Sequence, residues 1–421
     1  MTLVACLDVG STDTKLAVVD VVDGRLAATA THPTTAGTAG TDVLDGVDAL
    51  LAAAAARVGP VEQVYCCSSA GGGLRLAVVG QEALVSADAA HRVALSAGAR
   101  VVHVATGRQT PAQFREVRAA RPDVLLLAGG TDGGDPDTLL HNARRLAAAR
   151  WRVPVVVAGN SDVRDEVAGL LAARGLPVAA AGNVLPRIGV LDPAPARAAI
   201  REVFLRHVIG GKRLSRGTRF QRMVSAATPD AVLTGVALLA DQVADEGDLL
   251  VVDVGGATTD VYSALVPDES AAVASGVTGT GVAGTLWRAR TVEGDLGVRW
   301  NTDGVSAAAR RERLTVPDPA GGALGFAAVA AVVAVRRHTR TGRDLRNVVS
   351  VVASGGVFRH AEPAAAIAAL APTLHDRAGG WALPRAPHVA VDRRYVLAPA
   401  GLLAEDHPEA AAALLRRLLH R

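Results

Sequence analysis

The sequence has 421 residues, half of them apolar and 3% aromatic, so it is long enough to bury more than one hydrophobic core. Its formal net charge of +3 is small for this length and excludes the broad basic surface of most nucleic-acid-binding proteins. The three cysteines, Cys6, Cys66 and Cys67, make no CxxC pair or disulfide framework, which predicts a reducing cytoplasm and a buried Cys66-Cys67 pair.

The chain begins directly with a pair of strands, and no signal-peptide pattern precedes them. Around the turn between these strands lie a carboxylate, a glycine, hydroxyls and a lysine, namely Asp8, Gly10, Ser11, Thr12, Thr14 and Lys15. Asp23-Gly24 predicts a hairpin to a third strand, 43–58 predicts a helix and 61–68 a fourth strand. This order of three strands, a helix and a strand is that of a ribonuclease-H-like half, which we expect to start with residues 1–73.

From residue 74 to residue 190 the pattern changes to strands and helices in strict alternation, which predicts an inserted parallel α/β domain of the flavodoxin-like kind. The predicted strands are 75–79, 100–105, 123–128, 153–158 and 177–181, and the predicted helices are 81–97, 111–121, 136–150 and 162–174. The third strand ends in Gly129-Gly130, a position where open parallel sheets bind ligands, but a plain tight turn explains the glycines equally well.

Residues 191–246 predict a helical completion of the first half, with helices at 194–210 and 229–245. Between the helices lie five basic residues, Lys212, Arg213, Arg216, Arg219 and Arg222. We expect them in a solvated loop, with contact to an acidic partner as the alternative. The polar turn that ends at residue 248 predicts the start of the second half, residues 247–421.

The second half opens with a near copy of the first loop. An apolar strand ends in Asp253, and the turn and following strand supply Gly255, Gly256, Thr258 and Thr259. Backbone N–H groups and hydroxyls in such a loop donate to phosphate oxygens, while the carboxylate holds a metal ion or its water. Two loops of this kind in one chain predict a duplicated nucleotide-binding fold.

The remaining segments add one further glycine turn of interest. The strand predicted at 347–353 ends in Ser354-Gly355-Gly356, where the missing side chains would let the backbone approach an adenine face. A G-x-G-x-x-G pattern within 275–284 has no βαβ setting and does not predict a dinucleotide site. The longest apolar run, 325–335, is too short to cross a bilayer, so we expect no membrane partner.

The three glycine turns together have the chemistry of a nucleotide clamp. Two loops from two halves can close on a triphosphate and share Mg²⁺ and water between Asp8 and Asp253. We predict that these two aspartates bind the metal and act in catalysis, and that Glu293 is a third catalytic carboxylate. Other carboxylates that qualify by type as a general base are Asp13, Asp132 and Asp295.

The two loops and the Ser-Gly-Gly turn resemble the phosphate-1, phosphate-2 and adenosine motifs of the actin-like ATPase superfamily, which includes sugar kinases, actin and heat-shock chaperone ATPases. The resemblance implies two ribonuclease-H-like halves with ATP and Mg²⁺ between them. It places the residues named for the two loops on the phosphates and metal, and Ser354, Gly355 and Gly356 along the adenosine.

A second resemblance covers nearly the whole chain. Segments 8–15, 127–134, 253–260 and 291–297 are similar to the MutL or GlmL family of glutamate-mutase-associated proteins, which is unrelated to the mismatch-repair protein of the same name. The resemblance implies an ATP-hydrolysing chaperone that reactivates an adenosylcobalamin-dependent glutamate (methylaspartate) mutase, with the mutase subunits as partners.

Other functions stay open from the sequence. They are a small-molecule kinase of the same fold, an activator of a radical enzyme with an iron–sulfur cluster, for which Cys66-Cys67 is poorly suited, and a scaffold without ATP turnover. The inserted segment has the rhythm of a cobalamin-binding α/β domain without its Asp-x-His-x-x-Gly loop. It is therefore expected either to mimic or displace the cobalamin-binding subunit of a mutase or to serve as scaffold.

Overall fold

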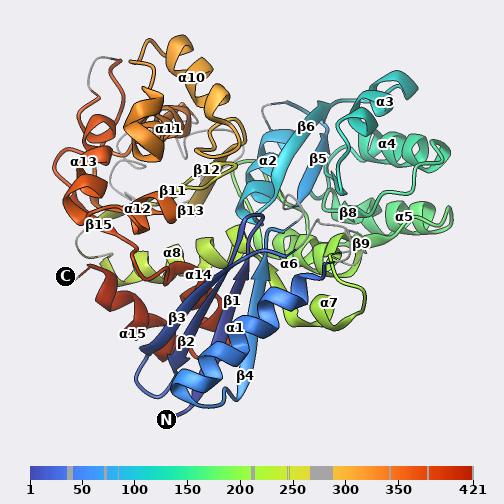
Figure 1. The fold of residues 1–421 in the computed structure, drawn as a ribbon. Coiled ribbons are helices and arrows are strands. Elements are labelled where there is room, and N and C mark those ends of the chain that lie inside the picture. Colours follow the sequence, from blue (N-terminus) through green and yellow to red (C-terminus); the bar gives the residue numbers. More distant parts are fainter. Residues whose placement is uncertain are drawn as a thin grey trace.

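Three five-stranded sheets form the framework of the protein in the part of the chain that the structure describes (Figure 1). The structure is a computed structural model, and it describes residues 1–35, 41–70, 74–83, 85–209, 214–243, 245, 247–265, 288–340, 343–376 and 379–419. The G-x-G-x-x-G pattern within 275–284 and the basic residues Lys212 and Arg213 lie outside the described residues.

The first sheet is built from the N-terminal segment and one later strand. In spatial order its strands are β10 (Val224–Ala227), β4 (Gln63–Ser68), β1 (Leu3–Val9), β2 (Asp13–Asp20) and β3 (Arg25–Pro33). Strands β1, β2 and β3 are antiparallel neighbours, while β4 runs parallel to β1 and to β10. Helix α1 (Val43–Val58) begins at a capping box between Asp42 and Asp45 and crosses over to β4.

The second sheet repeats this arrangement. In spatial order its strands are β13 (Arg288–Glu293), β12 (Thr259–Ala264), β11 (Asp248–Val254), β14 (Val348–Ser354) and β15 (His388–Val391). Strands β11, β12 and β13 are antiparallel neighbours, and β14 runs parallel to β11 and β15. Numbered in chain order within each sheet, both sheets have the order 3-2-1-4-5. The predicted duplication of a ribonuclease-H-like fold is confirmed.

The third sheet is parallel throughout and forms the inserted part of the chain. In spatial order its strands are β6 (Arg100–Thr106), β5 (Arg75–Gly80), β7 (Val124–Leu127), β8 (Val155–Val157) and β9 (Val178–Ala180). This 2-1-3-4-5 order is the flavodoxin-like one, as predicted. Its β7 and β8 read Val-Leu-Leu-Leu and Val-Val-Val and are fully buried, as strands with helices on both faces must be.

Helices cover the inserted sheet on both sides. They are α2 (Ser86–Ser96), α3 (Pro111–Ala119), α4 (Asp137–Ala148), α5 (Ser161–Ala172) and α6 (Ala194–Val203), which a π-helical turn (Phe204–Ile209) continues. Helices α3, α4 and α5 share one core with the face of the sheet that includes Leu125 and Leu127. The opposite face shares a core with α6, α1 and the first sheet. The inserted sheet is therefore packed onto the first half.

Three helices lie between the first and second sheets and share one core with both: α8 (Thr228–Val243), α14 (Leu397–Leu403) and α15 (Pro408–Leu419). Helices α8 and α14 touch through their backbones. A Cβ atom at Gly235 would lie 2.1 Å from the Leu397 carbonyl oxygen, and one at Gly401 would lie 1.8 Å from that of Ala231. No larger residue fits at either glycine unless the two helices move apart.

The outer face of the second sheet is covered by α10 (Thr302–Arg311), a 3₁₀ turn (Pro319–Gly321), α11 (Gly322–Thr339), α12 (Gly356–Arg359) and α13 (Pro363–Leu374). The helical stretch Pro319–Thr339 is long and apolar enough to cross a membrane, and half of its apolar window is buried inside the protein. Residues from Phe326 to Val335 along α11 pack in the core of this sheet.

The structure corrects the prediction for residues 191–246 in one respect. This stretch is not helical throughout, because β10 joins the first sheet as its edge strand beside β4. The described part of the predicted basic loop also contains a short helix, α7 (Arg219–Met223). The guanidinium of Arg219 pairs with Asp48 on α1, and the backbone of Arg216 binds Asp42, so part of this link is fixed against α1.

Candidate functional site

The two predicted phosphate loops occupy equivalent places in the two matching sheets. The first joins β1 to β2 and is closed by a hydrogen bond from Gly10 N to the Asp13 carbonyl, 3.1 Å. The second joins β11 to β12 and is closed in the same way, from Gly255 N to the Thr258 carbonyl, 2.9 Å. Both loops are therefore closed by a hydrogen bond between residues three positions apart, which follow equivalent strands of the two sheets.

The loops lie beside each other across the two halves. Trp300, which lies against the second loop, donates from its indole N–H to the Thr12 hydroxyl of the first loop, 3.3 Å away. A Cβ atom at Gly256 would lie 3.8 Å from the same hydroxyl oxygen. The backbone N–H of Trp300 in turn donates to the Gly256 carbonyl, 2.9 Å. Residues predicted from separate halves of the sequence are thus brought together.

The structure separates the predicted loop hydroxyls into two groups. Ser11 is exposed, and Thr12 and Thr258 are partly exposed. Thr14 and Thr259 are fully buried. The Thr14 hydroxyl lies 3.0 Å from that of Thr34, and the Thr259 hydroxyl donates to the Leu296 carbonyl. Hence Ser11 and Thr12 are the loop hydroxyls in position for a ligand. Thr258 donates to Asp260 at 3.2 Å, and Thr14 and Thr259 hold the loops in shape.

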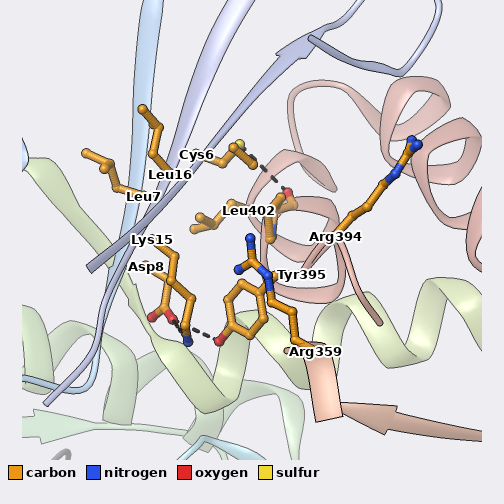
Figure 2. Close-up of a pocket in the computed structure, with 11 residues that line it drawn as sticks. Cys6, Leu7, Asp8, Lys15, Leu16, Arg359, Arg394, Tyr395 and Leu402 are labelled. Atoms are coloured by element: carbon orange, nitrogen blue, oxygen red, sulfur yellow. Dashed lines mark hydrogen bonds and ion pairs between the residues drawn. The ribbon is translucent and has the colours of Figure 1, made fainter. Parts of the chain in front are cut away.

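Asp8, at the end of β1, is the centre of a hydrogen-bond network (Figure 2). Its Oδ2 accepts from the Tyr395 hydroxyl at 2.8 Å and from the Lys15 ammonium at 3.2 Å. Its Oδ1 accepts from the Thr228 hydroxyl and from the Cys67 thiol. These four donors use all the lone-pair directions of a carboxylate. Lys15, with 24% of its side chain exposed, is the charged donor among them and can turn toward a ligand.

Tyr395 holds Lys15 in place from a second direction. The ammonium of Lys15 lies 3.7 Å from the centroid of the Tyr395 ring. Burial and the neighbouring Asp8 raise the pKa of the Tyr395 phenol, so it remains a neutral donor. Its backbone φ of 54° is unusual for a residue other than glycine and aims the ring at this network. Arg359 and Arg394 line the same small pocket (Figure 2).

Asp253 occupies the equivalent place at the end of β11, but its surroundings differ. The strand neighbour that matches Lys15 is here Asp260, a second carboxylate. Burial raises the pKa of Asp253 to about 6, and Asp260 and Asp8 act in the same direction, while Lys15 and a hydrogen bond from Ser354 oppose them. Asp8 and Lys15, which belong to the first half, thus act electrostatically on Asp253 in the second.

The predicted adenosine turn lies directly beside Asp253. Ser354, at the end of β14, pairs in register with Asp253. Gly355 has a φ of 104°, and a Cβ atom there would lie 2.1 Å from the Val254 carbonyl oxygen and 3.1 Å from Asp253 Oδ1. Gly356 begins α12, and a Cβ atom there would meet no atom within 4 Å. A side chain at position 355 would therefore collide with the backbone of Val254, whereas the space beside Gly356 is empty.

Glu293, the third predicted catalytic residue, lies at the end of β13 and is held by an ion pair. Its carboxylate contacts the guanidinium of Arg337 on α11 at 2.5 Å, and Arg337 also binds Asp295 at 2.7 Å. Burial raises the pKa of Glu293 while Arg337 lowers it. Asp132 follows β7 in the inserted sheet, where Asn183 and the backbone of Ser161 donate to it. Neither carboxylate makes a described contact with Asp8 or Asp253.

The three cysteines are free thiols in the core, which confirms the predicted burial of the Cys66-Cys67 pair. Burial raises the pKa of Cys6 and Cys66, which keeps both as thiols. In the described residues no group of three or more His, Cys, Asp or Glu side chains is placed to hold a metal ion. Two carboxylates nevertheless fit Mg²⁺, because this ion takes one or two carboxylates and completes its shell with waters and phosphate oxygens. Asp253 fits best as a direct ligand, since the Asp8 oxygens are already engaged.

The elevated pKa of Asp253 predicts a pH dependence of ligand binding. A metal-binding carboxylate must be ionised, so affinity for a magnesium–nucleotide complex should fall as the pH drops through about 6. The effect on folding has the opposite sign. A carboxyl group whose pKa is raised by folding stabilises the fold while it is protonated. The free energy of unfolding of the ligand-free protein should therefore decrease as the pH rises from about 4 to about 6. Calorimetric titrations from pH 5 to pH 8 check the first expectation, and Asp253→Asn, which cannot titrate, should flatten the profile.

Two residues of the site were not identified from the sequence. Tyr395 and Thr228 donate to Asp8 from positions 387 and 220 residues away in the chain. The only local signals were Thr228 before Pro229, a common start of a helix, and Tyr395 as one of three tyrosines in the chain. Neither signal indicates a contact with Asp8.

Comparison with known proteins finds similarity to one family over nearly the whole chain, the same extent as the resemblance seen in the sequence. The family model described as MutL protein matches residues 4–320 and 323–419. Protein MutL of Clostridium tetanomorphum is 34% identical over a 460-residue alignment that covers 98% of each chain.

Solved structures are similar only at a distance. Nucleotide-free acetone carboxylase has a TM-score of 0.41 at 14% identity, covering 96% of this chain and 70% of its own. The polyphosphate/ATP-glucomannokinase of Arthrobacter sp. strain KM has a TM-score of 0.31 at 13% identity, covering 98% of both chains. The fold assignment rests on the strand orders of the three sheets.

Proposed function

The chain belongs to the MutL protein family, and from this premise we propose that it binds ATP, hydrolyses it slowly, and thereby reactivates an adenosylcobalamin-dependent glutamate (methylaspartate) mutase. The nucleotide part is supported chiefly by the equivalent positions of Asp8 and Asp253 in the two sheets and by the electrostatic effect of Lys15 and Asp8 on Asp253. The partner part follows from the family resemblance.

The proposed domains follow the three sheets. Residues 1–73 and 191–246 make the first half, 247–421 make the second, and 74–190 make the inserted domain. ATP lies between the halves, with its phosphates at the two loops and its adenosine at Ser354, Gly355 and Gly356. Mg²⁺, held chiefly by Asp253 with Asp8 nearby, supplies charge neutralisation on the phosphates and orders water there.

The surroundings of each residue at the site indicate its role in binding and hydrolysing ATP. Ser11 and Thr12 donate hydroxyl hydrogens to phosphate oxygens, and Thr258 does so when its hydroxyl turns away from Asp260. Lys15 turns from Asp8 toward the phosphates, where its charge is worth more because the site is partly closed to water. Asp8 and Asp253 are placed to orient the attacking water and accept its proton. Glu293, engaged by Arg337, positions the end of β13 beside the second loop and is less suited to that step.

Slow turnover is consistent with a weak base at the site, because the oxygens of Asp8 already accept four hydrogen bonds among the described residues. A kinase requires a carboxylate free to accept the proton of an acceptor hydroxyl. Three of the four candidates by type are engaged, which leaves Asp13: Glu293 and Asp295 are paired with Arg337, and Asp132 is bound within the inserted sheet. This favours hydrolysis coupled to movement of the halves over transfer to a small acceptor.

The proposal is tested with the full chain, Mg-ATP and a mutase holding inactivated cobalamin. Slow phosphate release that rises when the mutase is added, together with recovery of mutase activity, is the expected result. A non-hydrolysable ATP analogue should bind without restoring activity. Fast turnover that depends on a small hydroxyl compound and ignores the mutase would identify a kinase instead. Pull-down with separated mutase subunits shows whether the cobalamin-binding subunit is the partner of the inserted domain.

A further inference from the structure

The second phosphate loop is held from one side by residues 298–301, which follow β13 and which we call the loop support. Backbone N–H groups among them donate to the carbonyls of Gly255 and Gly256, at distances of 2.9–3.2 Å. The side chain of Asn301 adds a further contact, because its Nδ2 donates to the Ala257 carbonyl at 2.6 Å. Three consecutive carbonyls of the loop thus face the loop support.

These contacts also fix the direction of the N–H groups of the loop. In a trans peptide, the carbonyl of one residue and the N–H of the next point in opposite directions. The N–H groups of Gly256, Ala257 and Thr258 therefore point away from the loop support, and none of them has an acceptor among the described residues. Successive N–H groups of this kind form a concave site for an anion. The loop support thus leaves three donors available for phosphate oxygens.

The first phosphate loop is supported from the equivalent position. Thr34 directly follows β3, which is in chain order the third strand of the first sheet, as β13 is of the second. The Thr34 hydroxyl donates to the Gly10 carbonyl at 2.9 Å, and its backbone N–H donates to the Thr12 carbonyl at 2.8 Å. A segment after the third strand therefore holds the loop carbonyls in both halves, which makes the support a property of the duplicated fold.

Asn301 is not an ordinary capping residue. It occupies the N-cap of α10, where asparagine normally accepts a hydrogen bond from the helix backbone, but its side chain makes no such bond. Its amide instead donates to the Ala257 carbonyl and, at 3.0 Å, to the Gly294 carbonyl. Capping does not explain an amide here, since serine and aspartate cap helices equally well. Two carbonyl acceptors require a donor with two hydrogens, which the amide supplies.

Gly294, the second acceptor of Asn301, lies against the inserted domain. A Cβ atom at Gly294 would lie 2.5 Å from the guanidinium carbon of Arg100, so this guanidinium packs directly on the glycine. Arg100 begins β6 of the inserted sheet. The residue before it, Ala99, accepts a hydrogen bond on its carbonyl from Arg290 of β13, at 3.2 Å. The inserted domain thus contacts the same turn to which Asn301 ties the phosphate loop.

We propose that Asn301 is a positioning residue of the ATP site, which directs the N–H groups of the second loop at the phosphates and joins that loop to the inserted domain through Gly294. This role presupposes the ATP binding proposed above and adds a regulator of the same site. A shift of Arg100 on Gly294 changes one of the two hydrogen bonds of the Asn301 amide, and with it the direction of the loop. A partner bound to the inserted domain can then alter ATP affinity, and ATP by reciprocity alters affinity for the partner.

The first test is Asn301→Ser, which keeps a residue able to cap α10 but removes both amide donors. Binding of Mg-ATP, Mg-ADP and adenosine to the full chain is measured by calorimetry. Affinity for ATP and ADP should fall about tenfold or more, as on loss of one hydrogen bond to a charged group. Adenosine carries no phosphate and should bind as before. The matched control is Asn347→Ser, at an exposed asparagine of the same half, and it should alter none of the three affinities.

A second variant tests the connection to the inserted domain. Arg100→Ala removes an exposed guanidinium from Gly294 and should weaken ATP binding about fivefold, the lower end of ordinary coupling between sites. Thermal unfolding checks that each variant is folded. If Asn301→Ser binds ATP as well as the unaltered chain does, or loses adenosine to the same extent as ATP, Asn301 has no positioning role. Unchanged ATP affinity in Arg100→Ala refutes the connection, whereas no ATP binding by the unaltered chain refutes the proposed function itself.

Discussion

Replacing Asp253 by asparagine should lower ATP hydrolysis by roughly 100-fold or more, which is the usual effect of removing an essential charged group from an active site. The carboxylate would no longer hold Mg²⁺ or orient water, whereas the side-chain shape and the hydrogen bond with Ser354 are largely kept. Phosphate release under saturating Mg-ATP measures the effect. Because the ionised Asp253 is unfavourable in the ligand-free fold, the variant should be at least as stable as the unaltered chain at pH 7.

The matched control is Asp303→Asn, an exposed aspartate in the first turn of α10. This variant removes one negative charge from the same half and should hydrolyse ATP at the unaltered rate. If Asp253→Asn keeps most of the activity while binding of nucleotide is intact, Asp253 is not the metal-binding carboxylate. Asp8, after displacement of Lys15, would then be the remaining candidate among the described residues.

Replacing Arg290 by methionine should lower the free energy of unfolding by about 3–5 kcal/mol, the typical cost of breaking a buried ion pair on one side. Arg290 is only 4% exposed and is bound to Asp260 and to the Ala99 carbonyl. Its removal leaves Asp260 as a buried carboxylate without its main counter-charge. Urea unfolding followed by circular dichroism measures the change.

A control for this effect lies two residues away on the same strand. Arg288 pairs with Asp241, and both residues are exposed, so Arg288→Met should cost no more than about 1 kcal/mol. A double variant, Arg290→Met with Asp260→Asn, should recover part of the loss because no unpaired carboxylate remains. Equal costs at 288 and 290, or no recovery in the double variant, would show that the buried ion pair is not what stabilises this strand.

Long, strongly patterned segments were predictable from the sequence. The inserted sheet is the clearest case, since its apolar runs are short, fully buried and separated by helices with ordinary starting signals, such as Thr110 capping α3. Strand β10 was missed because only four residues, Val-Ser-Ala-Ala, form it at the edge of the first sheet. Such a segment has too little local pattern to distinguish it from a loop, and its pairing with β4 decides its structure.

At the candidate site, the sequence predicted which residue types are present better than it predicted where their side chains point. The loops carry Thr14 and Thr259 within their motifs, but the pleat of the strands turns both hydroxyls into the interior. Nor does any local pattern indicate that Arg337, on a distant helix, neutralises Glu293. These contacts depend on how the helices pack on the sheets, which the order of residues along one segment does not contain.

The backbone contact of α8 with α14 has a mechanical consequence. Helix α8 starts at Thr228, and α14 starts two residues after Tyr395. The hydroxyls of Thr228 and Tyr395 both donate to Asp8. Both helices therefore begin close to Asp8, and their backbones come into contact at Gly235 and Gly401. We expect a phosphate that displaces Lys15 from Asp8 to change the hydrogen bonds at the starts of both helices, and these helices share a core with β11, the strand that carries Asp253.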